Sequence, residues 1–241
     1  MICKEIIQEM TLLQDEDQAN HLSGFFKTKK GEYGEGDKFL GIKVPVTRSI
    51  VKKYKNRITL NDIECLIKSE WHEIRLAGFL LLIELYNKEI KLKNTDTSEL
   101  LVKFYLDNLS RGNNWDLVDL VSPYILGDWI FKNPGKEKIL IGLSDEGSNI
   151  WFQRVSIVST FPLIKAGKFD ITFQIAQKFL KHNHDLIHKA TGWMLREIGK
   201  RGGKTELIKF LELNKSDMPR TMLRYAIEKF SDKERKYFMN K

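Results

Sequence analysis

The sequence predicts an all-α protein, a solenoid of stacked helix pairs. Apolar residues recur at helical spacing through most of the 241 residues, as in IRLAGFLLLIELY and ITFQIAQKFL, without sustained period-two alternation. Only five prolines occur, and Pro45, Pro134 and Pro219 stand where a helix would begin or break. With 42% hydrophobic residues, the chain is long enough to bury a core.

A weak internal repeat organises the predicted helices. The blocks RLAGFLLL, WDLVDLVS, RVSIVSTF, KATGWMLR and RTMLRYAI start at intervals of 40, 39, 35 and 31 residues. These intervals are typical of helical-pair repeats, which stack into a curved solenoid because one pair cannot bury its apolar face alone. Each block would supply an inner helix that begins with a basic or aromatic residue. The residues that begin the blocks, and would line a mostly cationic concave face, are Arg75, Trp115, Arg154, Lys189 and Arg220.

Loop signals are concentrated at residues 27–39, 143–149 and 199–204, where glycine and polar residues gather. None of these stretches is long enough to be an interdomain linker. We therefore predict one continuous domain over residues 1–241.

Positive charge is concentrated in the second half of the chain. The net charge is +8: residues 1–120 hold 18 Lys and Arg against 19 Asp and Glu, whereas residues 121–241 hold 22 against 13. In the first half, residues 38–57 are an exception, with seven basic residues and no acid. A surface formed from both regions would suit a polyanion such as nucleic acid. The alternative is a basic protein whose charge serves solubility alone.

The sequence shows no sign of a membrane segment or of export. No apolar run approaches the roughly 20 residues that span a bilayer, and MICKEIIQEM carries acids where a signal peptide is apolar. We therefore expect a cytoplasmic protein without membrane contact. Cys3 and Cys65 form no CxxC pair, so we expect reduced thiols rather than disulfides or a thiolate zinc site.

The stretch NNWDLVDLV, which starts at Asn113, holds an indole and two carboxylates within about one and a half helical turns. Trp115 and Asp119 are four residues apart, so on a helix they project from the same face. Asp116 would lie in the first turn, after a cap at Asn113 or Asn114, where its charge complements the helix dipole. Asp119 lies beyond that turn among apolar neighbours, and a carboxylate there needs a partner or a function.

Two interpretations of Asp119 are open. It either forms an ion pair with a basic residue of the next inner helix, such as Arg154, or it serves chemistry on a sugar. Breaking a glycosidic bond places positive charge on the sugar ring, and a fixed carboxylate beside an indole face stabilises that charge. Ordinary glycosidases also need a general acid. A leaving base that already carries positive charge, such as an alkylated purine, does not.

The other tryptophans are Trp71, Trp129, Trp151 and Trp193. Trp193 has Arg196 and Lys200 three and seven residues later, so it would present an indole flanked by phosphate-binding cations, or else pack in the core. For Trp129 and Trp151 we expect packing.

Five stretches of the chain resemble a known family. They are FLGIKVP (39–45), WHEIRLAGFLLL (71–82), NNWDLVDLVSPYILG (113–127), NIWFQRVSIVSTF (149–161) and HKATGWMLREIGKR (188–201). Together they are similar to the AlkD-type DNA alkylation repair enzymes over nearly the whole chain. The resemblance implies a superhelical solenoid of HEAT-like repeats with a basic concave face that grips duplex DNA. It also implies a monofunctional DNA glycosylase that removes cationic alkylpurines such as 3-methyladenine and 7-methylguanine, without metal or organic cofactor.

The resemblance also implies roles for single residues. Asp119 would be the catalytic carboxylate that stabilises the sugar cation and helps to position water. Trp115 and Trp193 would contact the deoxyribose, and Arg154 would bind the nearby phosphate. The lesion would not need to be flipped into a pocket, unlike in most glycosylases. The chain departs from the family in the connection KTKKGEYGEGDKF (27–39), which is longer than the family pattern.

We expect a monomer that binds duplex DNA containing alkylated bases. The cations expected to contact DNA are Lys43, Arg48, Arg75, Arg154, Lys189, Arg196, Lys200, Arg201 and Lys204. For the last three, in GKRGGK, a basic helix end closed by glycine is the alternative.

Two other motifs are weaker. His184 and His188 have a spacing that can bind zinc on a helix, but no third ligand is evident, so we expect no metal. The glycines of the 27–39 connection lack the context of a dinucleotide or phosphate loop, which favours a flexible loop. The alternative to the glycosylase is a non-catalytic HEAT-like module that binds DNA structures or a protein partner.

Overall fold

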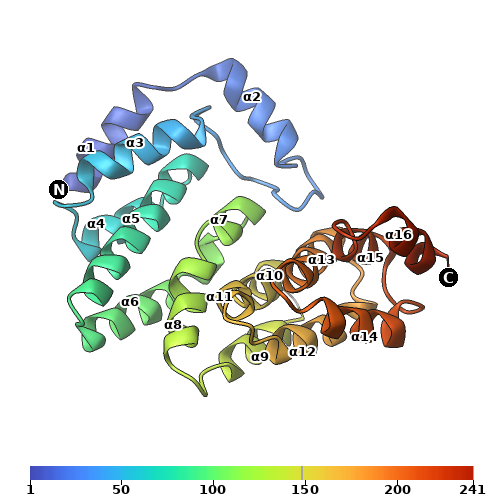
Figure 1. The fold of residues 1–241 in the computed structure, drawn as a ribbon. Helices are drawn as coiled ribbons and strands as arrows, with labels where there is room; N and C mark the ends of the chain where they lie inside the picture. Colours follow the sequence, from blue (N-terminus) through green and yellow to red (C-terminus); the bar gives the residue numbers. More distant parts are fainter. Residues whose placement is uncertain (148, 241) are drawn as a thin grey trace. The chain divides into compact units, whose positions relative to one another are not determined.

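The structure, a computed structural model, describes residues 1–147 and 149–240. In these residues the regular elements are helices, joined by turns and loops, and there is no β-strand (Figure 1). The all-α prediction is thus confirmed. The chain divides into two compact units, Met1–Val121 and Ser122–Lys241, which we call unit 1 and unit 2. The single domain over residues 1–241 stays a prediction.

Unit 1 is built around one long helix. Its helices are α1 (Ile2–Thr11), α2 (Glu16–Phe25), α3 (Val44–Tyr54), α4 (Leu60–Ile67), α5 (His72–Lys91), α6 (Thr95–Asp107), the 3₁₀ turn η1 (Leu109–Arg111) and α7 (Trp115–Asp119). Helix α5 packs against α3, α4, α6 and α7 (Figure 1). Every residue from His72 to Leu82 is buried, so the first half of α5 forms the centre of the core.

Unit 2 has the same kind of construction. Its elements are the π-helical turn η2 (Pro123–Gly127), α8 (Asp128–Lys132), α9 (Lys138–Ser144), α10 (Ile150–Val158), α11 (Phe161–Lys165), α12 (Asp170–Lys178), the 3₁₀ turn η3 (Phe179–Lys181), α13 (Asp185–Lys200), α14 (Lys204–Asn214), α15 (Arg220–Ala226) and α16 (Asp232–Met239). Helix α13 is its centre and packs against α10, α11, α12, α14 and α15. Trp129 and Trp151 are both buried, which confirms the packing role expected for them.

The repeat blocks correspond to helices α5, α7, α10, α13 and α15, but their register differs from the prediction. Trp115 and Arg220 open their helices as expected. Arg75, Arg154 and Lys189 instead lie inside theirs, because α5 begins at His72, α10 at Ile150 and α13 at Asp185. Within each unit these helices are packing partners: α5 with α7, α10 with α13, and α13 with α15.

The loops and breaks follow the sequence signals closely. Residues 27–39 form turns and bends without a helix, and the 199–204 stretch contains the turn between α13 and α14. The predicted loop at 143–149 overlaps the end of α9, and its Ser148 lies outside the described residues. Pro45 is in the first turn of α3, and Pro219 is the N-cap of α15.

Two further observations concern the chain as a whole. Cys3 and Cys65 are free thiols, and burial, together with the hydrogen bond between the two, raises the pKa of Cys3 to about 12. Within residues 1–147 and 149–240, no helix is both long and apolar enough to cross a membrane.

The contact between α13 and α15 gives a test of the fold. A Cβ added at Gly192 would lie 2.5 Å from both the Met222 carbonyl oxygen and the Tyr225 Cβ. Overpacking of this kind costs about 1–3 kcal/mol. We expect Gly192→Ala to lower the free energy of unfolding by about 2 kcal/mol, measured by guanidinium denaturation followed by circular dichroism.

The matched control is Gly142→Ala in α9, where an added Cβ meets nothing within 4 Å. This change should raise the free energy of unfolding by about 0.5–1 kcal/mol, because alanine loses less backbone entropy than glycine in a helix. If both changes stabilised the protein equally, the close approach of α13 and α15 would be wrong.

Candidate functional site

Helix α7 begins at the residue that the sequence indicated. The Asn114 side chain accepts the backbone N–H of Trp115 at 2.9 Å, so Asn114 is the N-cap. The other candidate, Asn113, accepts a hydrogen bond from Arg75 instead. Trp115 and Asp119 are the first and last residues of α7, and both are half-buried. Part of each side chain can therefore reach a ligand, about one helical turn apart.

Two phenylalanines that follow one another in the chain support the Trp115 indole. The ring of Phe26 stacks on it with a centroid separation of 5.2 Å, and Phe25 meets it edge-on at 5.9 Å. Phe26 in turn stacks on Phe39 at 5.1 Å. Sequence reasoning assigned no role to these rings. They fix the plane of Trp115 through offset and edge-to-face contacts.

A buried chain of charged groups lies behind α7. His72, at the start of α5, contacts Asp37 through Nδ1 at 2.7 Å and Asp116 through Nε2 at 2.9 Å. All three side chains are buried. Asp116 also accepts the backbone N–H of Leu117 at 2.8 Å, which satisfies one of the free donors in the first turn of α7. Asp116 is therefore structural, as expected, but through His72 as well as through the helix dipole.

Arg75 belongs to the same network and not to the surface. Its side chain is 3% exposed, and Nη2 donates to Asp37 and, at 3.0 Å, to Asn113. Its Nη1 donates to the backbone carbonyls of Ser69 and Glu70 at 3.2 and 3.0 Å. A guanidinium committed to these acceptors is not placed to bind a phosphate. The structure thus gives Arg75 a structural role, and its contact with DNA stays an untested prediction.

The network shifts two pKa values in opposite directions. Burial alone would lower the pKa of His72, but the charges and hydrogen bonds of Asp116 and then Asp37 outweigh it and raise the pKa to about 9. Burial alone would raise the pKa of Asp37, but the hydrogen bond and charge of His72, and then Arg75, bring it below its ordinary value. Both shifts favour the charged forms.

The FLGI motif has a structural explanation in unit 1. The Glu73 carboxylate accepts the backbone N–H groups of Leu40, Gly41 and Ile42 at 2.9, 2.9 and 3.1 Å. Gly41 has a φ of 87° and lies against the backbone of Asp15, so a larger residue would clash there. The motif therefore fixes the chain that leads into α3.

Lys43 and Arg48 follow directly and are exposed, at the N-cap and inside α3. Both are in a position to meet a polyanion. Their contact with DNA stays a prediction.

Arg154 lies inside α10 in unit 2 and is only 5% exposed. Its Nη1 donates to the backbone carbonyl of Leu186, in the first turn of α13, at 2.6 Å. This bond ties the two helices together. Arg154 therefore has at least a structural role, and its predicted phosphate contact is untested.

Trp193 lies in the middle of α13 and is half-buried. The preceding Gly192 lets α15 approach closely. The position leaves the residue partly exposed, and both alternatives for Trp193, a sugar contact and core packing, stay untested.

The other predicted DNA-binding cations of unit 2 each have an acidic neighbour. The buried carboxylate of Glu197 forms ion pairs with Lys200 at 2.8 Å, with Arg201 at 3.4 Å and with Arg196 at 3.7 Å. The remaining pairs are Arg196 with Glu228, Lys189 with Asp185 and Lys204 with Glu234. Ion pairs at the surface, such as those of Lys189 and Lys204, contribute only about 0–1 kcal/mol, so a phosphate can compete for these two cations.

The predicted constellation is thus divided between the two units. Trp115 and Asp119 are in unit 1, and Arg154 and Trp193 are in unit 2. Their arrangement around one substrate stays a prediction.

The histidines of the HNHDLIH stretch serve the start of α13. The Nδ1 atom of His184 accepts the backbone N–H of Leu186 as the N-cap, and Nε2 of His188 contacts the carbonyl of His182. Among the described residues, no three His, Cys, Asp or Glu side chains are grouped to hold a metal.

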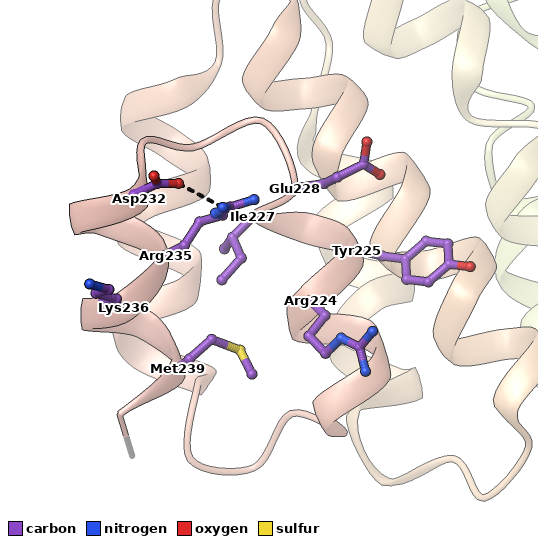
Figure 2. A pocket seen from close by; sticks show the side chains of 8 residues that line it. All are labelled: Arg224, Tyr225, Ile227, Glu228, Asp232, Arg235, Lys236 and Met239. Carbon is purple, nitrogen blue, oxygen red and sulfur yellow. Dashed lines mark hydrogen bonds and ion pairs between the residues drawn. The ribbon is translucent and has the colours of Figure 1, made fainter.

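Figure 2 shows a pocket of about 760 Å³ in unit 2, lined by residues of α15 and α16 and the turn between them. Its walls carry both signs of charge, and Arg235 pairs with Asp232 at 2.6 Å. A second pocket, of about 630 Å³, lies beside Phe169 and Phe173. The lining of both pockets contains none of the predicted site residues, so neither is the site that the sequence indicates.

Comparison with known proteins supports the family that the motifs suggested. A solved structure described as a predicted DNA alkylation repair enzyme from Enterococcus faecalis superposes with a TM-score of 0.69, at 15% sequence identity, over 91% of this chain and 97% of the other. At that identity the likeness shows the fold alone. A search of curated protein sequences finds no match.

The family evidence comes from a sequence model. The model of the DNA alkylation repair enzyme family matches residues 6–230, a range that includes α7, α10 and α13. Because this match covers nearly all of both units, the chain belongs to the family of DNA alkylation repair enzymes.

Proposed function

We propose that the protein is a DNA glycosylase that excises positively charged alkylpurines, such as 3-methyladenine and 7-methylguanine, from duplex DNA. Membership of the family supports a role in the repair of alkylated DNA. The observation that carries the finer proposal is α7, where half-buried Trp115 and Asp119 share one face and are held from behind by stacked rings and a buried charge network.

The proposed reaction needs little from the protein beyond a fixed negative charge. The bond between C1′ of the deoxyribose and N9 of the purine breaks, and its electron pair neutralises the positive charge of the leaving base. The sugar is left as a cation, to which water adds with loss of a proton to solvent. Asp119 stabilises that cation, and the negative π-face of Trp115 does the same. No general acid is required, because the base leaves as a neutral molecule.

Unit 2 would supply further contacts with the DNA. Trp193 would contact the deoxyribose from α13, and the cations of α13 and α14 would bind backbone phosphates after exchanging their acidic neighbours for them. Arg154 would bind the phosphate next to the lesion. Because its side chain is nearly buried, mutation must separate this role from its bond to α13.

The first test is single-turnover release of 3-methyladenine and 7-methylguanine from methylated duplex DNA. Asp119→Asn keeps the shape of the side chain and removes its charge, so we expect the release rate to fall by about 100- to 1,000-fold. Duplex affinity, measured by fluorescence anisotropy, should change little. The control is Asp107→Asn, which removes the same charge from an exposed residue at the end of α6. This variant should release base at the wild-type rate.

The alternative function has a distinct signature in the same assay. If the wild-type protein binds duplex DNA tightly but releases neither base, the non-catalytic binding module replaces the glycosylase. An equal loss of binding and release in Asp119→Asn would instead make Asp119 a structural ion-pair partner.

The DNA interface is tested by the salt dependence of duplex binding. Each phosphate contact contributes about 0.9 to the slope of log affinity against log salt concentration. We expect Lys43→Ala and Arg48→Ala each to reduce the slope by about that amount, because both side chains are exposed beside the FLGI motif.

Lys209→Ala, on α14, removes an equal charge from a position with no predicted contact and should leave the slope unchanged. Arg154→Gln is the informative comparison. A weaker affinity with an unchanged slope would assign Arg154 to the structure of unit 2 and remove it from the interface.

A further inference from the structure

The buried side chains of Asp37, His72 and Asp116 form a hydrogen-bonded network that connects three parts of unit 1 that are distant in sequence. Asp37 belongs to the 27–39 segment, His72 to α5 and Asp116 to α7. The site proposed above uses only α7. The buried network reaches Trp115 and Asp119, the two residues of α7 in the proposed site, through Asp116 between them.

The hydrogen-bond geometry alone assigns a charge to His72. Each ring nitrogen lies within hydrogen-bond distance of a carboxylate oxygen, at 2.7 and 2.9 Å. An ionised carboxylate only accepts, so both ring nitrogens must donate. A neutral imidazole carries one N–H and can satisfy only one of the two. The arrangement therefore fits the imidazolium.

Aromatic rings enclose the same imidazole. Phe39 stacks on it with a centroid separation of 4.5 Å, and Phe26 lies at 5.1 Å. The faces of phenyl rings favour a cation. Phe26 also stacks on Trp115, so His72 is linked to Trp115 both through this ring and through Asp116, the next residue in the chain.

Among the buried side chains of this network, two carboxylates are matched by two cations only while His72 is protonated. Asp37 from the segment and Asp116 from α7 face it, and Arg75 from its own helix pairs with Asp37. Arg111, from η1, is near enough to Arg75 for their charges to interact. Loss of the His72 proton would leave one buried carboxylate without a counter-charge, which is strongly unfavourable.

We propose that His72 is a positioning residue for α7: its imidazolium, held between Asp37 and Asp116, ties the helix to the 27–39 segment and so sets the place of Trp115 and Asp119. The inference rests on the proposed function, because its purpose is to orient the excision site. The link is specific to one protonation state. Since the pKa of His72 is raised to about 9, the link is intact at neutral pH and is lost as the pH rises through about 9.

The direct test follows Trp115 without using activity. The protein is prepared with 5-fluorotryptophan, and the ¹⁹F resonance of residue 115 is assigned as the one missing from Trp115→Phe. In the wild-type protein we expect this resonance to move in one transition near pH 9, as His72 loses its proton. In His72→Gln the transition should be absent. In Asp116→Asn it should lie at lower pH, because one of the two carboxylates that raise the His72 pKa is gone.

The control is His21→Gln, the same substitution at an exposed histidine of α2, which should keep the transition near pH 9. Should His72→Gln fail to fold, the displaced transition in Asp116→Asn carries the test. A resonance that does not move in the wild-type protein, or that moves equally in His72→Gln, overturns the inference.

The second readout is the single-turnover excision rate as a function of pH, at saturating protein. The wild-type rate should fall as the pH rises through the transition seen by ¹⁹F. His72→Gln should be slower by roughly 10- to 100-fold at neutral pH, because a small displacement of catalytic groups is enough for such a loss, and its rate should lack that transition. Duplex affinity at neutral pH should stay the same.

The two proposals fail in different ways. If the wild-type protein releases base and His72→Gln does so at the same rate, the positioning role is wrong and the glycosylase stands. If the wild-type protein releases no base while the resonance of residue 115 still titrates, the glycosylase is wrong and the link between His72 and α7 stands.

Discussion

Unit 1 depends on how it accommodates the charged side chains at the start of α5. His72, Glu73 and Arg75 are all buried there, and a buried charge is tolerated only when it is paired and hydrogen-bonded. Glu73 is satisfied by three backbone N–H groups of the FLGI motif, and the two cations share Asp37. Helix α7 has five residues, far too few to be stable alone. In our proposal, its attachment to His72 is what makes it a firm support for Trp115 and Asp119.

Unit 2 handles its charges differently. The cations of α13 and α14 remain near the surface, and acids of the same unit neutralise them in part, with Glu197 serving several at once. The pairs of Lys189 and Lys204, whose acids are partly exposed, are weak and sensitive to salt, in contrast to the enclosed network of unit 1. One unit therefore encloses its charges, while the other leaves part of its cations in weak surface pairs.

The sequence was sufficient for the helical class, for the cap before Trp115 and for the core positions of Trp129 and Trp151, because periodicity and local capping rules determine them. It was insufficient for Arg75, which periodicity placed on a cationic face but which is buried, because no local rule says which distant acid will meet a given arginine. Asp37 lies 35 residues before His72, inside a glycine-rich stretch that looked like a plain loop. One signal was present: three ionisable residues stand directly before the apolar run LAGFLLLI, and a buried helix start requires partners for them.

The 27–39 segment is held on both sides, by Phe26, which directly precedes it and stacks on Trp115, and by Asp37 near its end, which contacts His72. Between those anchors lies the tip around Gly31, where the backbone N–H bonds to Glu35 of the same segment and an added Cβ would have no neighbour within 4 Å. Closing a longer loop costs little extra entropy, about 0.6 kcal/mol for each doubling of its length. Evolution can therefore lengthen or shorten this tip without disturbing the groups behind α7. In the laboratory, the same tip is a suitable place to insert a label or a short affinity tag.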